Sequence, residues 1–354
     1  MLPFAAASVA AGHEVAVAAP HAFAPHVDAA GYPFLPFLGI SSARVDKLLE
    51  ASEQDPAIAD HFGAQLFGGL AARAALPGIR DAIETYRPDL IVRDVAELAS
   101  LVAAESCGIP EIAVFSSVHR YVCALLEDAL PLLRPLGIRA TSPATNSITL
   151  FPESFDPVGE TPTVYRFRSG SPSARIRSPR PLVYLSYGTV LPRHADGVAA
   201  LRASAGALGE LAADVLVSIG GSDPSLCRGL GSNVRAQAWV DEDEVLPRAD
   251  LVVCHGGGGT TLAALRAGVP LLVVPHFGDQ PAIGDAVTTG GFGLCVGADG
   301  PPRPEDLRAA AGRILGDPSF AERAAKLAAE IAGLPPVEAA VPLFERLATA
   351  RRPA

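Results

Sequence analysis

The fold class of this chain is decided by residues 249–274, which read A-D-L-V-V-C-H-G-G-G-G-T-T-L-A-A-L-R-A-G-V-P-L-L-V-V. An apolar strand, a glycine turn, a helical stretch and a second apolar strand follow one another here. A similar unit occurs earlier, where Pro88-Asp89-Leu90-Ile91-Val92 leads through a helical stretch to Gly108-Ile109-Pro110. Short strands that alternate with helices indicate βαβ units and a parallel sheet. We therefore predict an α/β chain of two similar doubly wound domains. The alternative is that any βαβ unit shows this pattern, in which case the similarity does not indicate two similar domains.

The rest of the chain continues this alternation. Short apolar runs predict strands at 15–19, 90–93, 111–115, 182–186, 215–219, 251–254 and 271–274. Longer runs predict helices at 2–11, 46–53, 64–86, 95–107, 197–211, 304–315, 319–331 and 337–349. The stretch 166–180 is rich in Ser, Pro and Arg and has neither period, which is typical of a linker. Because 354 residues are enough for about two domains, we expect domains at 1–168 and 180–336, followed by a terminal helical segment at 337–354.

Composition and charge exclude several classes of protein. The formal net charge of -10 argues against a nucleic-acid-binding protein, because binding to phosphates requires a basic face. No apolar run approaches the ~18 residues of a membrane span. The first basic residue is Arg44, which excludes the basic start of a signal peptide. The five cysteines are odd in number and form no CxxC motif, as is typical of a reduced, cytoplasmic protein.

The strongest local motif is the glycine turn between an apolar strand and a helix. Four consecutive glycines, Gly256 to Gly259, remove side chains where a ligand must approach the backbone. The free N–H groups and the dipole of the following helix then favour an anion such as phosphate. His255 adds a hydrogen-bond donor, and Thr260 is predicted as an N-cap or a phosphate contact. No Lys follows, which excludes a P-loop, and Thr261 stands where a dinucleotide fingerprint has Gly or Ala, which leaves an oxidoreductase as a distant alternative.

Three further features accompany this turn. Asp279 and Gln280 follow the next strand, and a carboxylate beside an amide suits hydrogen bonds to vicinal sugar hydroxyls. Trp239 is the only tryptophan, and it is expected either to stack on a nucleobase or to pack in the core. The acidic run 241–244 contains D-x-D, as some metal sites do, but we interpret it as the first turn of a helix, where acidic side chains complement the helix dipole. We therefore predict neither a metal nor a cofactor.

Taken together, the run from Trp239 to Gly293 resembles the donor-binding signature of family 1 glycosyltransferases of the GT-B fold, particularly the bacterial natural-product glycosyltransferases. The stretch Ser186-Tyr187-Gly188-Thr189-Val190 is similar to the turn that faces the sugar diphosphate in that family. Residues 334–347 resemble its closing helix, which crosses back to the N-terminal domain. The resemblance covers most of the chain and implies two Rossmann-like domains that face each other across a cleft, the first of which binds the acceptor.

The resemblance also implies an activity and a set of site residues. Family members transfer a sugar from a nucleoside diphosphate, here UDP or dTDP, to a hydroxyl of a small natural-product aglycone, with inversion and without a metal ion. By motif position, the diphosphate would lie against Gly188, Thr189, His255, Gly257, Gly258, Gly259, Thr260 and Thr261. The nucleobase would lie by Trp239, with Glu242 as an acceptor for a pyrimidine imide N–H. The sugar hydroxyls would be held by Asp279 and Gln280.

The chain departs from the family pattern at three places. The Pro-Gln that follows the tryptophan is Asp241-Glu242, and the Asn-Ala that follows the D-Q pair is Ile283-Gly284. Met1 stands inside the stretch that resembles the first helix, so we expect the first strand and the loop with the catalytic His to be missing. Asp94 matches the carboxylate that orients this His, whereas His13 matches a G-H-E-V motif and is not the base.

Two alternatives stay open at this point. A non-catalytic or truncated homologue would bind nucleotide sugar, or a partner enzyme, without turnover. A GT-B epimerase or lipid-linked sugar transferase would usually have a basic surface that faces the membrane, and a net charge of -10 does not indicate such a surface. The sequence leaves open UDP against dTDP, O-transfer against N- or C-transfer, and a monomer against a homodimer.

Overall fold

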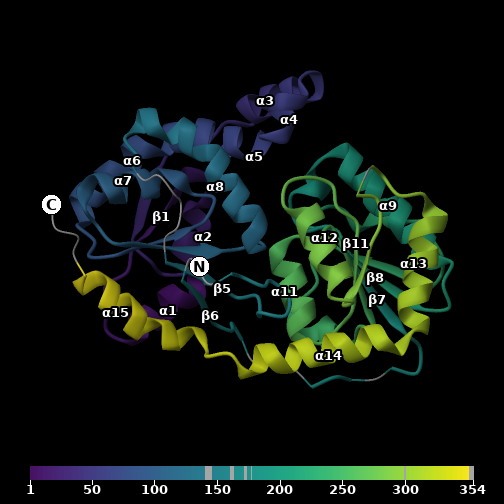
Figure 1. Cartoon of the computed structure of the whole chain (residues 1–354). Coiled ribbons are helices and arrows are strands. Elements are labelled where there is room, and N and C mark those ends of the chain that lie inside the picture. The colour runs from purple at the N-terminus through teal and green to yellow at the C-terminus, as the bar shows by residue number, and fades with distance from the viewer. Residues whose placement is uncertain (140–145, 160–162, 171–173, 177, 299, 351–354) are drawn as a thin grey trace. The chain divides into compact units, whose positions relative to one another are not determined.

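The structure is a computed structural model that describes residues 1–354 except 140–145, 160–162, 171–173, 177, 299 and 351–354. Parts of the predicted linker, 171–173 and 177, and the end of the predicted terminal segment lie outside the described residues. The chain divides into two compact units, each with its own core (Figure 1). The first unit contains Met1–Leu150, Val158–Ser169 and Pro335–Ala354, and the second contains Phe151–Pro157 and Gly170–Leu334.

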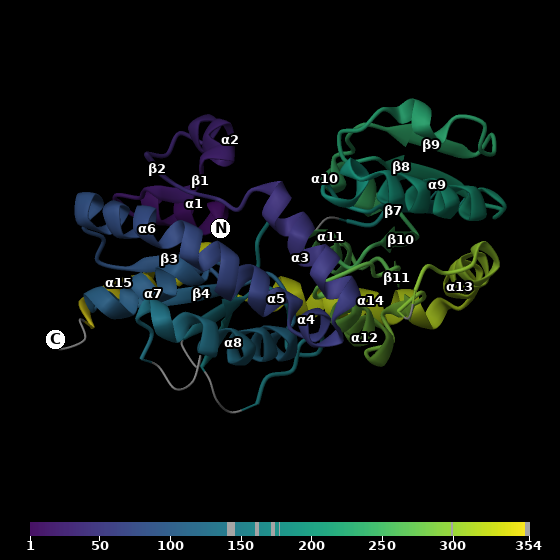
Figure 2. The same cartoon turned by 90° about the horizontal axis from the view of Figure 1, so that it is seen from above.

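The first unit consists of two parallel sheets and the helices around them. Its strands are β1 (Val17–Pro20), β2 (Phe34–Phe37), β3 (Ile91–Asp94), β4 (Glu111–Phe115), β5 (Ser147–Thr149) and β6 (Val164–Arg166). Its helices are α1 (Leu2–Ala10), α2 (Ala24–Ala29), α3 (Ser42–Gln54), α4 (Pro56–Asp60), α5 (Phe62–Ala64), α6 (Ala72–Tyr86), α7 (Leu98–Cys107), α8 (His119–Leu133) and α15 (Val341–Thr349), with a π-helical stretch at Gln65–Ala71. Among the described residues, β1 pairs only with β2 (Figure 2). The strands β3, β4, β5 and β6 form a second sheet in that order.

The C-terminal segment belongs to the first unit. Arg168 donates its N–H to the Pro335 carbonyl at 2.8 Å, and Val337 donates to the Arg168 carbonyl at 3.1 Å. Beyond this link, Phe344 of α15 meets Phe4 of α1 edge to face, with 6.1 Å between ring centroids. Both rings are buried in one apolar cluster with residues of β4 and β5. Burial of this apolar surface is the main force that holds the segment in place.

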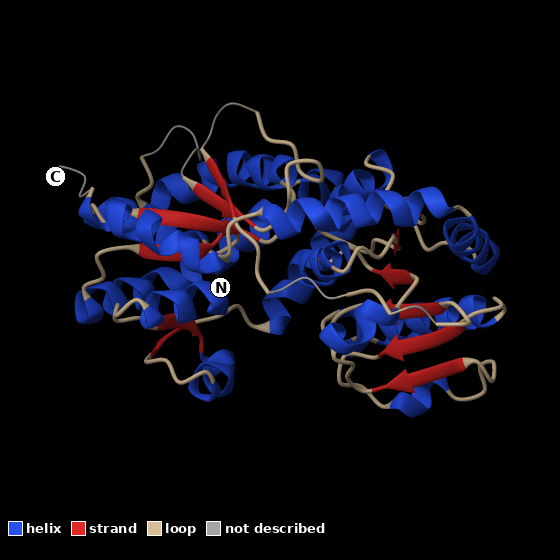
Figure 3. Ribbon diagram, turned by 90° about the horizontal axis from the view of Figure 1, so that it is seen from below, coloured by secondary structure: helices blue, strands red, loops and turns tan. Residues whose placement is uncertain are grey.

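The second unit contains one parallel sheet of six strands, in the order β12-β11-β10-β7-β8-β9. The strands are β7 (Leu182–Ser186), β8 (Asp214–Ser218), β9 (Val234–Gln237), β10 (Leu251–Cys254), β11 (Leu271–Val273) and β12 (Gly293–Cys295). The helices are α9 (Ala195–Gly209), α10 (Glu242–Val245), α11 (Gly258–Arg266), α12 (Gln280–Thr289), α13 (Pro304–Gly316) and α14 (Pro318–Gly333). All strands of this sheet point the same way (Figure 3), so their C-terminal ends share one edge.

Burial explains why these strands read as apolar runs. The four residues of β10 are fully buried, and α9 and α13 pack together against one face of the sheet. Strands covered on both faces carry apolar residues at successive positions instead of alternating ones. The predicted α/β class with parallel sheets is confirmed. No helix among the described residues is both long and apolar enough to cross a bilayer.

Candidate functional site

The turns at the C-terminal edge of the six-stranded sheet form a pocket of about 620 Å³ within the second unit. The strand order reverses between β7 and β10, which is where open α/β sheets bind ligands. A volume of this size suits a small molecule or cofactor. The pocket is lined by eleven of the donor-site residues predicted from the sequence, namely Gly188, Thr189, Trp239, Glu242, His255, Gly257, Gly258, Gly259, Thr260, Asp279 and Gln280. Thr261 is fully buried and is not at the pocket, so its predicted contact with the diphosphate is wrong.

The glycine turn leaves a helix N-terminus open to this pocket. Gly257 is the N-cap of α11, and no side chain caps the helix. The first N–H groups of a helix have no intrahelical partner, and the helix dipole adds positive potential there. An anion in the pocket would therefore find unpaired donors already in place. Thr260 is the third residue of α11 and not its N-cap, so the prediction of Thr260 as an N-cap is wrong.

His255 is held between two glycines. A Cβ on Gly188 would lie 2.9 Å from the imidazole Cε1, and a Cβ on Gly257 would collide with Nε2. Only glycine therefore leaves room for the ring at either position. Burial lowers the pKa of His255 to about 4, the neighbouring His276 adds to the shift, and the Ser186 backbone opposes it. The imidazole is thus neutral near pH 7, and its Nδ1 is buried without a hydrogen-bond partner among the described residues.

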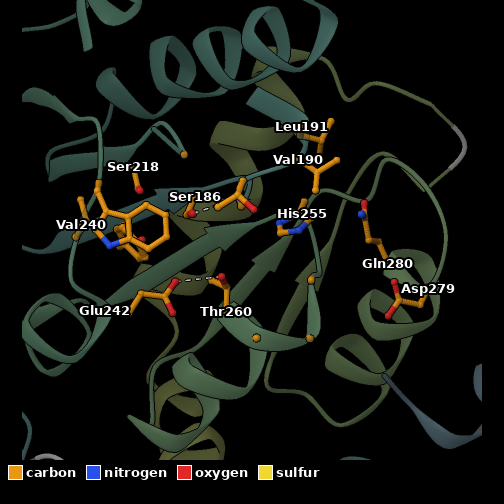
Figure 4. Close-up of a pocket in the computed structure, with 18 of the residues that line it drawn as sticks. Ser186, Val190, Leu191, Ser218, Val240, Glu242, His255, Thr260, Asp279 and Gln280 are labelled. Carbon is orange, nitrogen blue, oxygen red and sulfur yellow. Dashed lines mark hydrogen bonds between the residues drawn. The ribbon is translucent and has the colours of Figure 1, made fainter. Parts of the chain in front are cut away.

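Glu242 and Thr260 form one hydrogen-bonded pair at one side of the pocket (Figure 4). The Thr260 hydroxyl donates to the Glu242 carboxylate at 3.0 Å. Burial raises the pKa of Glu242, and the hydrogen bond from Thr260 opposes this shift. Because its hydroxyl proton is used by Glu242, Thr260 has its backbone N–H rather than its hydroxyl to offer an anion.

Trp239 lies at the pocket with 67% of its surface exposed. The alternative that it packs in the core is therefore wrong. The acidic run that follows it begins helix α10, since the Asp241 carboxylate accepts the Asp243 N–H at 2.9 Å as the N-cap. An exposed indole beside a binding pocket is an apolar surface that a planar ring can cover.

Asp279 and Gln280 stand where α12 begins, at the other side of His255 (Figure 4). Gln280 is only 3% exposed. Its Oε1 accepts the backbone N–H groups of His276 at 2.8 Å and Phe277 at 3.2 Å. Asp279 is the N-cap residue of α12, but its side chain does not cap the helix. The pair is thus at the pocket as predicted, with the amide oxygen of Gln280 already engaged by the backbone.

Asp94 lies in the first unit, at the end of β3, and not among the residues of this pocket. Its Oδ1 accepts the Ala96 N–H at 2.9 Å. Beneath it, the buried Arg93 donates to the carbonyls of Asp94 and Val95 and to the Glu111 carboxylate. The turn that carries Asp94 is therefore fixed by its own hydrogen bonds. The orienting role of Asp94 stays a prediction.

Several residues of the pocket were missed by the sequence analysis. They are Tyr184, Leu191, Ser218, Gly220, Val240, Asp241 and Phe277, whereas Ser186 and Val190 belong to the stretch 186–190 that resembles the turn facing the sugar diphosphate. Ser218 ends a strand that the sequence does predict, so the rule that ligands bind at strand C-termini could have found it. Phe277 is more than half exposed, which no local pattern indicates.

Comparison with known proteins finds relatives over most of the chain. Residues 202–346 match the family described as Erythromycin biosynthesis protein CIII-like, C-terminal domain. The L-demethylnoviosyl transferase of Streptomyces niveus is 33% identical over 319 residues, which cover 84% of this chain and 82% of that protein. The elloramycin glycosyltransferase ElmGT of Streptomyces olivaceus is 31% identical over 75% of this chain and 70% of that protein.

A solved structure shares the fold over almost the whole chain. The spinosyn rhamnosyltransferase SpnG superposes with a TM-score of 0.79 at 24% identity, and the match covers 98% of this chain and 95% of that chain. SpnG has also been solved in complex with thymidine diphosphate. These similarities confirm the family resemblance and the fold that the sequence predicts.

Proposed function

Because this chain belongs to the bacterial natural-product glycosyltransferases of the GT-B fold, we propose that it transfers a sugar from a UDP-sugar or dTDP-sugar to a hydroxyl of a small natural-product aglycone. The reaction inverts the anomeric carbon and uses no metal ion. The protein works in the cytoplasm, a location supported by its five free cysteines, since reducing compartments keep thiols unpaired.

The order of groups along the pocket carries this proposal. Glu242 and Thr260 lie on one side of His255, and Asp279 and Gln280 lie on the other (Figure 4). We place the nucleobase against Trp239 and Glu242, the diphosphate at the N-terminus of α11, and the sugar at Asp279 and Gln280. A nucleotide sugar presents its base, its diphosphate and its sugar in the same order.

The N-terminus of α11 supplies the electrostatic part of the mechanism. The leaving group is the nucleoside diphosphate, and its negative charge grows as the bond between the anomeric carbon and the phosphate oxygen breaks. Fixed N–H groups and a helix dipole aimed at that charge stabilise the transition state. The acceptor hydroxyl attacks the opposite face of the anomeric carbon, so a single displacement inverts it. The hydroxyl proton passes to a base that Asp94 would orient, and no residue of this chain is assigned as that base.

Titration calorimetry of the full chain with UDP, dTDP and NAD tests the donor site. We expect UDP or dTDP to bind and NAD not to bind. The variant Trp239→Ala weakens nucleotide binding about five- to 150-fold, since stacking of a base on an aromatic ring is worth about 1–3 kcal/mol. It leaves the melting temperature unchanged because the indole is 67% exposed. A folded protein that binds neither nucleotide would rule out the donor site.

Turnover is measured as release of UDP or dTDP from a sugar nucleotide, with a panel of hydroxylated aglycones as acceptors. Release that requires an acceptor and persists in EDTA is the expected result, with the β-anomer formed from an α-linked donor. Loss of release in EDTA would contradict the metal-independent mechanism. Binding of the sugar nucleotide without release for any acceptor would identify the non-catalytic alternative.

A further inference from the structure

We propose that Gln280 positions the sugar-binding turn and the diphosphate-binding turn together, and that it presents only its amide nitrogen to the donor sugar. The proposal rests on the proposed function for the identity of the ligand. Gln280 lines the pocket and yet is only 3% exposed. Its side chain is therefore packed into the wall of the pocket instead of extending into it.

The side-chain amide oxygen of Gln280 is hydrogen-bonded to the protein backbone. It accepts two N–H groups, from His276 at 2.8 Å and from Phe277 at 3.2 Å. An amide oxygen has two lone pairs, so these two donors use its capacity. A sugar hydroxyl can then meet Gln280 only at Nε2, which donates and does not accept.

The backbone of Gln280 joins this turn to the glycine turn. A Cβ on Gly256 would lie 3.1 Å from the Gln280 carbonyl oxygen and 3.3 Å from its Cα. Gly256 also has φ of +89°, a conformation that favours glycine. The turn before α11 and the turn before α12 are therefore in close contact through Gln280. A shift of Gln280 moves the residues that face the diphosphate as well as those that face the sugar.

Asp279 and Gln280 therefore offer the donor sugar one hydrogen-bond acceptor and one hydrogen-bond donor, in fixed positions. The Asp279 carboxylate only accepts hydrogen bonds when ionised, and the Gln280 amide nitrogen only donates them. Two adjacent sugar oxygens bound by this pair must therefore act differently, one as a donor to Asp279 and the other as an acceptor from Gln280. An Oε1 held by two backbone donors prevents the amide from flipping to reverse these roles.

Three variants separate the two roles of Gln280. In Gln280→Glu, the carboxylate still accepts both backbone N–H groups but has no donor for the sugar. In Gln280→Met, both roles are lost. The double variant Asp279→Asn with Gln280→Glu keeps the net charge of the pair and exchanges its polarity. Gln54→Met, at the exposed end of α3, is the matched control.

Two measurements follow the two roles. The two hydrogen bonds from the backbone of His276 and Phe277 to Oε1 of Gln280 are called the brace. Hydrogen exchange of the segment 276–280, measured without ligand, reports whether the brace is formed. Calorimetry with a free nucleoside diphosphate and with its sugar nucleotide reports the contribution of the sugar. We expect Gln280→Met to speed exchange at least about tenfold, because two hydrogen bonds are lost, and to weaken binding of the free nucleotide as well. Gln280→Glu keeps the wild-type exchange rate and loses at least about tenfold of the affinity that the sugar adds. The double variant regains part of this affinity, because its amide at position 279 donates to one hydroxyl while the other hydroxyl donates to the carboxylate at position 280.

The outcomes distinguish this proposal from the proposed function. Unchanged exchange in Gln280→Met would overturn the brace, and full sugar-dependent affinity in Gln280→Glu would overturn the donor role. If Gln280→Met does not fold, the unchanged exchange expected for Gln280→Glu still tests the brace, since faster exchange there contradicts it. A wild-type protein with slow exchange that binds no nucleotide would refute the proposed function and the donor role while the brace stands.

Discussion

A similar βαβ unit in each compact unit carries the same sequence pattern, and these two copies differ at their turns. In the first unit it is β3-α7-β4, and in the second it is β10-α11-β11, both with parallel strands. Gly108 and Gly268 follow their helices with φ of +64° and +67°. The next N–H in each copy, that of Ile109 or Val269, bonds at 3.0 Å to the carbonyl five residues back. The two strand-helix-strand units, called the frame below, therefore share the same geometry down to the C-terminus of the helix.

The helix N-termini are where the copies differ. Glu97 is the N-cap of α7, and its carboxylate accepts the N–H groups of Ala99 at 2.9 Å and Ser100 at 3.0 Å. The N-cap of α11 is Gly257, and no side chain fills this place. The Glu97 carboxylate accepts hydrogen bonds from the first N–H groups of α7, whereas the first N–H groups of α11 are left for a ligand. An anion site thus arises from this frame through the removal of a side chain.

The largest effect is expected when an acidic residue is added at the N-terminus of α11, because it removes the difference between the two helix N-termini. Gly259 has open space around a Cβ, so Gly259→Asp introduces a carboxylate without a clash. We expect binding of UDP or dTDP to weaken at least about 100-fold, because a like charge about 4–5 Å away costs roughly 3–4 kcal/mol at an effective dielectric constant of ~20. The melting temperature does not fall, since an acid in the first turn stabilises a helix by about 0.3–1 kcal/mol. Calorimetry and thermal unfolding measure the two effects.

Gly259→Asn is the control, because it has the shape of Asp without the charge. We expect it to keep most of the nucleotide affinity. Equal losses in Gly259→Asp and Gly259→Asn would mean that bulk at the turn, and not charge at the helix N-terminus, decides binding.

The ends of the two strands offer a second test. His255 lies five residues after Asp250, and Asp94 lies five residues after Asp89, so the two side chains occupy matching positions. The pKa of His255 is lowered to about 4 by burial, from 6.5. The unfolded chain therefore takes up a proton below about pH 6.5 while the folded one stays neutral until about pH 4. The free energy of unfolding must fall as the pH falls through this window.

Between pH 7.5 and pH 5, His255 alone removes about 2 kcal/mol of unfolding free energy. Urea unfolding at the two pH values measures this change, with fluorescence of Trp239, the only tryptophan, as the probe of the second unit. His255→Asn removes the titrating group and makes the pH dependence shallower by that amount. The same pH dependence in the variant and the wild type would show that His255 is not buried as a neutral ring.

The common frame was predictable from the sequence because its determinants are local. Apolar strands, the glycine after each helix and the following proline lie within about 25 residues of one another. Local chemistry also explains one error, since a helix is predicted from Val95 but α7 begins at Leu98. Asp94 and Glu97 take up N–H groups of the turn and delay the helix. The strands β2, β5, β6, β9 and β12 were not predicted, because the three or four residues of each include a proline, a serine, an arginine or a glycine and so give no continuous apolar run.

The candidate site was predictable in its membership and not in its geometry. Most motif residues line the pocket, because strand C-termini of one parallel sheet meet at one edge. The engagement of Thr260 with Glu242 depends on two helices that are separate in the sequence. The space for His255 depends on Gly188, which follows a strand 67 residues earlier, and no periodicity encodes such a contact.

The smallest expected effect tests what the two copies share. Gly108→Ala and Gly268→Ala each force an alanine into the left-handed region, at a cost of about 1 kcal/mol of unfolding free energy. A Cβ on Gly108 meets nothing within 4 Å, and one on Gly268 lies 3.4 Å from the Ala325 Cα, so neither adds a severe clash. We expect similar small shifts of the urea midpoint and unchanged nucleotide affinity in both. A loss of affinity confined to Gly268→Ala would show that the C-terminal end of α11 also sets the geometry of its N-terminus, so that the frame and the turn are not independent.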